Sequence, residues 1–132
     1  SAEKYGDVTA LGEIRAAKYL RSKGINVHFQ KPKGPRGDGT ADFLVGGERG
    51  TGKGGIVTDV LTPQSAKYRN VFKSISDKNS QATSIILDLT NNPNVRASQL
   101  GSQANILREV RAILEPQGIS MRINKVVVID FK

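Results

Sequence analysis

The sequence contains no cysteine, one histidine and few aromatic residues, 5% of the total. The absence of cysteine excludes disulfide bonds and thiolate metal sites. The lone histidine, His28, excludes acid–base catalysis by a pair of histidines. With so few aromatic side chains, recognition of nucleic-acid bases on an aromatic sheet is disfavoured. No apolar run reaches the roughly 18 residues that a transmembrane helix needs, so we expect no membrane span.

Positive charge is what the sequence has in excess. Its 132 residues include 20 Lys and Arg against 12 Asp and Glu, a net charge of +8 at pH 7, and the pI is near 10.0. Such a charge predicts a polyanionic partner, for which nucleic acid, an acidic protein and an anionic membrane surface are all candidates. The length predicts a single domain over residues 1–132, long enough to bury a core.

Hydrophobic periodicity predicts an α/β fold with a mixed β-sheet flanked by helices. The two most apolar runs, at residues 84–89 and 125–131, are typical of strands that are covered on both faces. A helix between them predicts a parallel, right-handed crossover. The expected elements are a lead-in (1–8), a helix (9–23, with Ala10, Ile14, Ala17 and Leu20 inward), three strands (25–29, 42–45, 56–61), a helix starting at Thr62, a strand (84–89), a helix (97–115) and a strand (125–131).

The Gly-rich connector at residues 46–55 joins two strands that are expected to form a hairpin. Its sequence nearly matches the phosphate-binding P-loop, but Gly54 stands where the metal-binding hydroxyl is needed. The connector also leads into a strand, whereas a P-loop leads into a helix N-terminus. We therefore expect a hairpin tip in which Arg49 and Lys53 bind substrate phosphates.

Two aspartates and one glutamate are the strongest candidates for chemistry. Asp42 begins the first strand of the hairpin, Asp59 lies near the end of the second, and Glu13 lies at the edge of the apolar stripe of the first helix. Converging carboxylates could bind a hard divalent cation, which would activate water for attack on a phosphodiester. The same residues are equally compatible with ordinary strand-end and helix-flank acids, and spacing does not decide between these interpretations.

Four segments carry a more specific signal: GTADFLVGG, GIVTDVLTPQSAKYRNV, KNSQATSIILDL and INKVVVIDFK. In order and spacing they resemble the C-terminal toxin domains of contact-dependent growth inhibition proteins (CdiA), in particular the tRNA-nuclease class. The third segment corresponds to a Gln-Ala motif that precedes a hydrophobic strand in that class. The resemblance extends from Leu11 to Phe131, nearly the whole chain.

The resemblance implies a restriction-endonuclease-like core of the PD-(D/E)xK type. The catalytic set would then be Glu13, Asp42, Asp59 and Lys78, with the three acids as ligands of Mg²⁺, Mn²⁺ or Zn²⁺. The family's simplest pattern has its lysine two residues after the second acid, a position that holds Leu61 here. The lysine would come from the following helix, where Lys67 is the alternative to Lys78. Lys67, Arg49 and Lys53 would bind substrate.

The resemblance also implies partners and a location. The chain would be the C-terminal part of a secreted or cell-surface bacterial protein, delivered as a monomeric toxin into the cytoplasm of a target cell, where it cleaves tRNA. A cognate immunity protein would block it in the producing cell. Because the toxin is basic, we expect the immunity protein to be acidic and to cover the cleft around Asp42 and Asp59.

Three other functions are compatible with the sequence. A metal-independent ribonuclease of the barnase or colicin kind would retain activity in a chelator. A DNase is compatible because a phosphodiesterase core does not itself choose the sugar. A non-catalytic nucleic-acid-binding module would retain its function when Asp42 and Asp59 are replaced by asparagine.

Overall fold

The computed structural model describes residues 2–30 and 41–132, with the backbone alone for residues 2–10. Within these residues, five strands form a single sheet that is flanked by helices. None of the helices in the described part of the chain combines the length and apolar character that crossing a bilayer requires. The elements are α1 (Ala2–Ser22), β1 (Val27–Phe29), β2 (Phe43–Val45), β3 (Ile56–Leu61), α2 (Tyr68–Ser76), β4 (Ser84–Asp88), α3 (Ala97–Leu100), α4 (Gln103–Leu114), the 3₁₀ turn η1 (Glu115–Gln117) and β5 (Lys125–Ile129).

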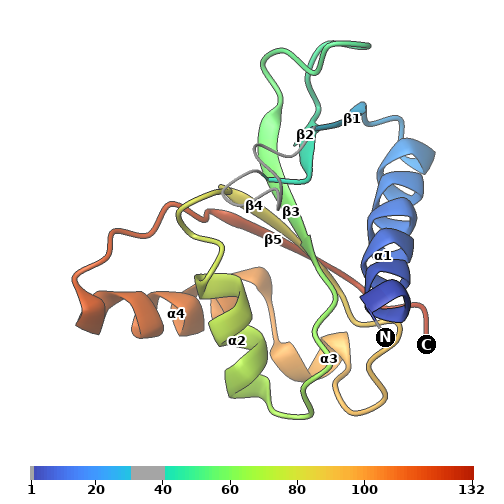
Figure 1. Ribbon diagram of the computed structural model, residues 1–132. Coiled ribbons are helices and arrows are strands. Elements are labelled where there is room, and N and C mark those ends of the chain that lie inside the picture. Colours follow the sequence, from blue (N-terminus) through green and yellow to red (C-terminus); the bar gives the residue numbers. More distant parts are fainter. Residues whose placement is uncertain (1, 31–40) are drawn as a thin grey trace.

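The sheet has the strand order β1-β2-β3-β4-β5 and mixes two kinds of pairing. The strands β1, β2 and β3 pair antiparallel, whereas β3, β4 and β5 pair parallel. Figure 1 shows α1 beside one face of the sheet and α2 and α4 beside the other. The prediction of a mixed sheet with flanking helices is therefore confirmed. The antiparallel hairpin β2–β3 extends past the rest of the sheet to the connector at the top of the view.

The central strand β4 is apolar on both faces because helices cover both. Ile85 and Leu87 belong to the core cluster that includes Val71 of α2. Ile86, between them in sequence, belongs to the cluster that includes Ala17 of α1. The period-two alternation of a strand therefore divides one apolar run between two helical layers.

The first helix differs from its prediction at its start. The expected lead-in is helical from Ala2 onward. Its Ala, Glu and Lys residues are good helix formers, so nothing in residues 2–8 ends the helix, and Thr9 is not needed as a cap.

The buried face of α1 also differs in part from its prediction. Ala17 and Leu20 are buried as expected, but Ile14 is 47% exposed. Ala10 lies outside the residues whose side chains are described. Small residues make this contact because α1 approaches the sheet closely: a Cβ atom on Gly12 would lie 2.5 Å from Cγ2 of Thr62.

The second helix begins later than predicted, at Tyr68 instead of near Thr62. The intervening backbone is held by the buried Asn92 side chain, whose Nδ2 donates to the carbonyl oxygens of Pro63 (3.1 Å) and Ser65 (2.9 Å). These bonds satisfy carbonyls that a continuous helix would have used internally. Proline before a helix is therefore only a weak indication of its first residue.

The helix predicted over residues 97–115 is divided into α3 and α4. The division falls at Ser102, whose hydroxyl accepts a hydrogen bond from the backbone N–H of Asn105 at 3.2 Å. Serine is a strong N-cap, and this bond starts a new helix where the periodicity alone predicted continuation.

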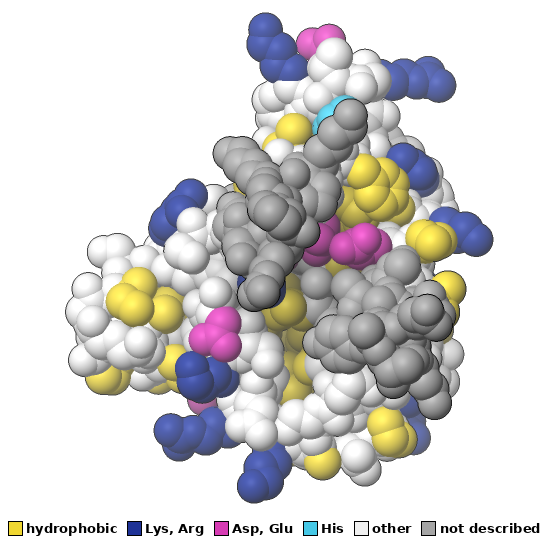
Figure 2. Space-filling view, viewed as in Figure 1, with side chains coloured by type: hydrophobic (Ala, Val, Ile, Leu, Met, Phe, Trp, Pro, Cys, Tyr) yellow, Lys and Arg dark blue, Asp and Glu magenta, His cyan; other side chains and the backbone are white. Residues whose placement is uncertain are grey.

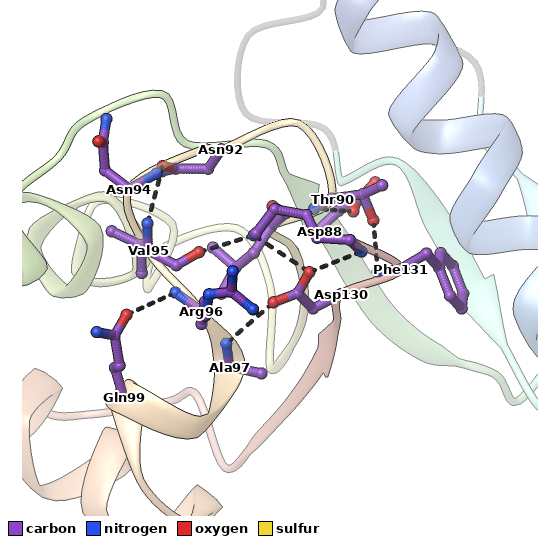
Figure 3. Close-up of polar contacts among 12 residues, drawn as sticks. Asp88, Thr90, Asn92, Asn94, Val95, Arg96, Ala97, Gln99, Asp130 and Phe131 are labelled. Carbon is purple, nitrogen blue, oxygen red and sulfur yellow. Dashed lines mark hydrogen bonds and ion pairs between the residues drawn. The ribbon is translucent and has the colours of Figure 1, made fainter.

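A polar network closes the carboxyl ends of β4 and β5 (Figure 3). Asp88, whose side chain is fully buried, accepts from the Thr90 N–H (3.0 Å) and pairs with Arg15 of α1 (2.5 Å). Asp130 accepts from the N–H of Ala97 at the start of α3, at 3.2 Å. All these carboxylates have partners inside the fold. We therefore assign this network to structure, because it ties α1 and α3 to the end of the sheet.

A candidate active site where two strands part

The candidate site lies where the β2–β3 ladder ends. The last paired residues there are Phe43 and Thr58, so Asp42 and Asp59 occupy the next position on their strands. Beyond this point, the carboxylates of these two residues accept the hydrogen bonds that ladder carbonyls would otherwise accept. The N–H of Asp42 donates to Oδ1 of Asp59 (3.0 Å), and the N–H of Val60 donates to Oδ2 of Asp42 (2.9 Å). Two carboxylates are thereby fixed against each other by the separating backbones.

The segment after α2 supplies two further groups to this site. Gln81 donates from Nε2 to Oδ2 of Asp59, and Lys78 lies close enough to lower the pKa of Asp59. Asp59 itself is 2% exposed. Gln81 was not among the residues predicted from the sequence. Its signal was the Gln-Ala motif before a hydrophobic strand, which carried the resemblance but was given no role.

The first helix supplies the third acid. Glu13, partly exposed on α1, lies close enough to Asp42 to raise its pKa by hydrogen bonding and charge repulsion. Glu13 follows Gly12, which allows α1 to approach the end of β3. Figure 2 shows acidic side chains gathered near the middle of one face, next to hydrophobic ones, with Lys and Arg spread around the outline.

Both aspartates have a raised pKa, so they are weaker acids than a free aspartate. The pKa of Asp42 is raised to about 6, mainly by burial and also by the hydrogen bond and charge of Glu13, against the lowering effect of the hydrogen bond from the Val60 N–H. Burial likewise raises the pKa of Asp59, and the Asp42 charge adds to it, against the lowering effects of Gln81 and Lys78. Buried, mutually repelling carboxylates are typical of sites that bind a cation or transfer a proton.

Four of the predicted site residues are therefore close together: Glu13, Asp42, Asp59 and Lys78. The alternative lysine, Lys67, is the exposed N-cap of α2, at the opposite end of that helix from Lys78.

The other two predicted substrate-binding residues lie elsewhere. Arg49 and Lys53 are exposed in the connector beyond the far end of β2. They are therefore separated from the acids by the length of that strand.

The donor atoms of the site are of the kind that binds a divalent metal, but in the described part of this structure they are not arranged as a metal site. Clustered carboxylate oxygens are the ligands that Mg²⁺ and Mn²⁺ prefer. In the described ranges, however, no three His, Cys, Asp or Glu side chains are arranged to hold an ion. Both oxygens of Asp59 accept hydrogen bonds, one of them from Gln81. Coordination by Asp59 would therefore need the Gln81 amide to move or to share its acceptor.

We expect Asp42→Asn to stabilise the metal-free fold at neutral pH. The folded state binds a proton that the unfolded state releases between pH 3.8 and about 6, so the free energy of unfolding falls as the pH rises through that interval. A shift of this size corresponds to at most about 3 kcal/mol, and solvent screening of this partly exposed carboxyl lowers that figure. Asparagine can still accept from the Val60 N–H and carries no charge to repel Glu13.

The measurement is urea unfolding in EDTA at pH 4.5 and pH 7.5. Asp42 should make the free energy of unfolding of the parent smaller at pH 7.5 than at pH 4.5. The Asp42→Asn variant should lack this contribution and show a weaker dependence on pH. The matched control is Asp77→Asn, because Asp77 is exposed and makes only a surface pair with Lys73. A destabilised Asp42→Asn variant would identify Asp42 as a structural acid.

The fold and site together define a mixed α/β domain with an acidic centre at a strand fork. No family model matches the chain, and no curated protein sequence matches it either. One solved chain, from a CdiA-CT/CdiI toxin and immunity complex of Burkholderia pseudomallei, has the same fold with a TM-score of 0.59. It is 24% identical, and the match covers 96% of this chain and 80% of that one.

Proposed function

We propose that the chain is a contact-dependent growth inhibition toxin domain that cleaves tRNA with the help of a divalent metal. The observation that carries the proposal is the convergence of Glu13, Asp42, Asp59 and Lys78 in a protein of net charge +8. A basic surface binds a polyanion by phosphate contacts, and an acidic centre repels it unless a cation or proton intervenes. The fold shared with a chain of a toxin and immunity complex supports the same function.

Each residue has a distinct role in this proposal. Asp42 and Asp59, with Glu13, would hold the metal, which supplies an activated water and neutralises charge on the phosphate. Lys78 is near enough to lower the pKa of Asp59 by its charge, and it could stabilise negative charge that develops on the scissile phosphate. Gln81 fixes the orientation of Asp59 through Oδ2.

The PD-(D/E)xK assignment rests on where these residues come from. An acid from a helix, two acids from a hairpin and a lysine are the elements of that arrangement. Leu61, at the position of the usual lysine, packs against the apolar core beside α2. We infer that Lys78 replaces the usual lysine, because the segment after α2 reaches the same carboxylate from another direction.

A toxin of this class needs an immunity protein, and we expect an acidic one. Of the two roles in such a complex, the charge of +8 favours the toxin over the inhibitor of a nucleic-acid enzyme. The association rate with the cognate partner should fall at least about tenfold between low salt and 0.5 M salt. An association rate that is independent of salt, or a partner that still binds Asp42→Lys as tightly as the parent, would contradict an acidic partner over the cleft.

The metal-independent alternative also has a specific observation in its favour. An aspartate whose pKa is about 6 can act as a general base near neutral pH without any metal. Asp42 would then deprotonate a ribose hydroxyl, and Lys78 would again stabilise the phosphate. This alternative requires RNA as substrate and predicts a cyclic phosphate product.

The direct test is incubation of the purified domain with total tRNA and, separately, with single- and double-stranded DNA, each in Mg²⁺ and in Mn²⁺. Discrete tRNA fragments with intact DNA would support the proposal. Cleavage of DNA alone would reassign the substrate. Intact tRNA and DNA under all conditions would reject a nuclease that acts unaided.

A further inference from the structure

A cavity lies along the edge strand β1 and extends from Phe29 to the connector, past the end of β2 that is farther from the acidic site. It has a volume of about 670 Å³, within the range of small-molecule sites, and lies between the end of α1, the strand β1 and the connector. Its charged and aromatic lining consists of Arg21, His28, Phe29, Glu48 and Arg49. The proposed catalytic residues do not line this cavity.

The connector lines one side of this cavity and is held in shape by its own hydrogen bonds. The Glu48 N–H donates to the Lys53 carbonyl (2.9 Å), and the Gly52 N–H donates to the Glu48 carbonyl (2.8 Å). Gly52 has a φ of +74°, and a Cβ atom there would lie 2.6 Å from Cβ of His28. Only glycine allows this close approach, so the connector forms a defined wall of the cavity.

The lining of the cavity includes a stacked arginine–aromatic pair. The guanidinium carbon of Arg21 lies 5.5 Å from the centre of the Phe29 ring, and Nη2 of Arg21 donates to the Val27 carbonyl (3.1 Å). The Phe29 ring also packs edge-on against buried Phe43, 4.8 Å between centroids, yet Phe29 remains 43% exposed. Aromatic rings and arginine planes are the surfaces on which unpaired RNA bases stack.

The β1–β2 pairing connects the cavity to the acidic site. Phe29 pairs with Phe43, and the next N–H along β1, that of Gln30, donates to the carbonyl of Asp42 at 3.0 Å. From Asp42 to Gly47 at the cavity is five residues, about 16 Å at the rise of an extended strand. A nucleic-acid strand cut at Asp42 and Asp59 could therefore continue into the cavity.

We propose that this cavity is a subsite for an unpaired nucleotide of the RNA substrate, a few positions along the strand from the cleaved phosphodiester. The Arg21–Phe29 stack would receive the base, and Arg49 would contact a phosphate. Glu48, an exposed lining residue, is negatively charged and should weaken the binding of the RNA phosphate. The subsite rests on the proposed ribonuclease function but makes binding predictions that do not depend on cleavage.

The test is fluorescence anisotropy of a short labelled single-stranded RNA, with Asp59→Asn as the common background so that nothing is cut. Arg49→Ala and Phe29→Leu should each weaken binding about tenfold. Arg49→Ala should also make the salt dependence shallower by about one phosphate contact. Lys53→Ala is the matched control: the sequence predicted a phosphate contact for Lys53 as for Arg49, but in the structure Lys53 is an exposed cation of the same connector that does not line the cavity, so the subsite requires a smaller loss for Lys53→Ala. Glu48→Gln should tighten binding.

Equal losses in Arg49→Ala and Lys53→Ala would reduce the effect to general charge and overturn the subsite. So would unchanged RNA affinity in Phe29→Leu, with a matching thermal melt to show that the variant is folded. If these variants instead lose affinity for an acidic protein partner alone, the cavity is a protein-binding site. If the parent cleaves tRNA but the variants bind RNA as tightly as the Asp59→Asn background, the subsite is rejected and the nuclease function is retained. If the parent neither binds nor cleaves RNA, the function and the subsite fail together.

Discussion

Replacement of Asp59 by asparagine is expected to lower the rate of tRNA cleavage at least about a hundredfold, the scale of losing a group that acts on the reacting atoms. Asp59 has three partners in the site: it accepts hydrogen bonds from the N–H of Asp42 and from the Gln81 amide, and the charge of Lys78 acts on it. Asparagine keeps the shape and can still accept from the Asp42 N–H. The substitution therefore removes charge with little change in packing. The measurement is the initial rate of fragment formation from total tRNA.

The control for this loss is Asp77→Asn, which removes the same charge from an exposed position on the segment after α2. Its rate should stay within about twofold of the parent, since a surface pair contributes little. Circular dichroism and thermal melting of both variants separate lost chemistry from lost folding. Full activity in a folded Asp59→Asn variant would identify the fork as structural.

Removal of divalent metal with EDTA is expected to reduce tRNA cleavage to background, and added Mg²⁺ or Mn²⁺ should restore it. Without a cation, burial and the neighbouring Glu13 raise the pKa of Asp42 to about 6, and the acidic site repels any phosphate that approaches. A bound cation would relieve this repulsion and should raise the melting temperature of the parent but not of Asp42→Asn. This shift is a readout that needs no substrate.

The outcome in EDTA separates the two ribonuclease mechanisms. Undiminished cleavage, with a cyclic phosphate at the new end, would establish Asp42 as a metal-free general base. Cleavage would then be lost as the pH falls below about 6, because the base becomes protonated. A rate that depends on metal and a melting temperature that responds to metal would together favour the metal mechanism.

Several features of the fold were predictable because they depend on local pattern. The apolar runs of β4 and β5 and the hairpin of β2 and β3 occur near their predicted positions. Helix boundaries were not predictable to the same degree. Ser102 starts a new helix by capping it, and Asn92 holds the backbone before α2 through two carbonyls. Both effects depend on one or two side-chain hydrogen bonds, which hydrophobic periodicity does not reveal.

The candidate site was likewise predictable from sequence only in part. Asp42 and Asp59 could be paired from sequence, because a hairpin brings its two strands side by side. The choice of lysine could not be made from sequence, since Lys67 and Lys78 both flank one helix. Chain reversal after α2 brings Lys78 to Asp59 and leaves Lys67 at the far end. The catalytic roles of all these residues remain predictions.

The sequence by itself determined the class of sheet, the hairpin that carries two acids and a surface charge suited to a polyanion. These follow from composition and from periods of two and 3.6 residues, which act over a few neighbours. Only the tertiary structure decided that Gln81 bonds to Asp59 with the charge of Lys78 nearby, that the strand ladder opens at the acids, and that the connector lines the same cavity as Phe29. Each of these is a contact between segments distant along the chain. Its existence depends on how the layers pack, which no local pattern contains.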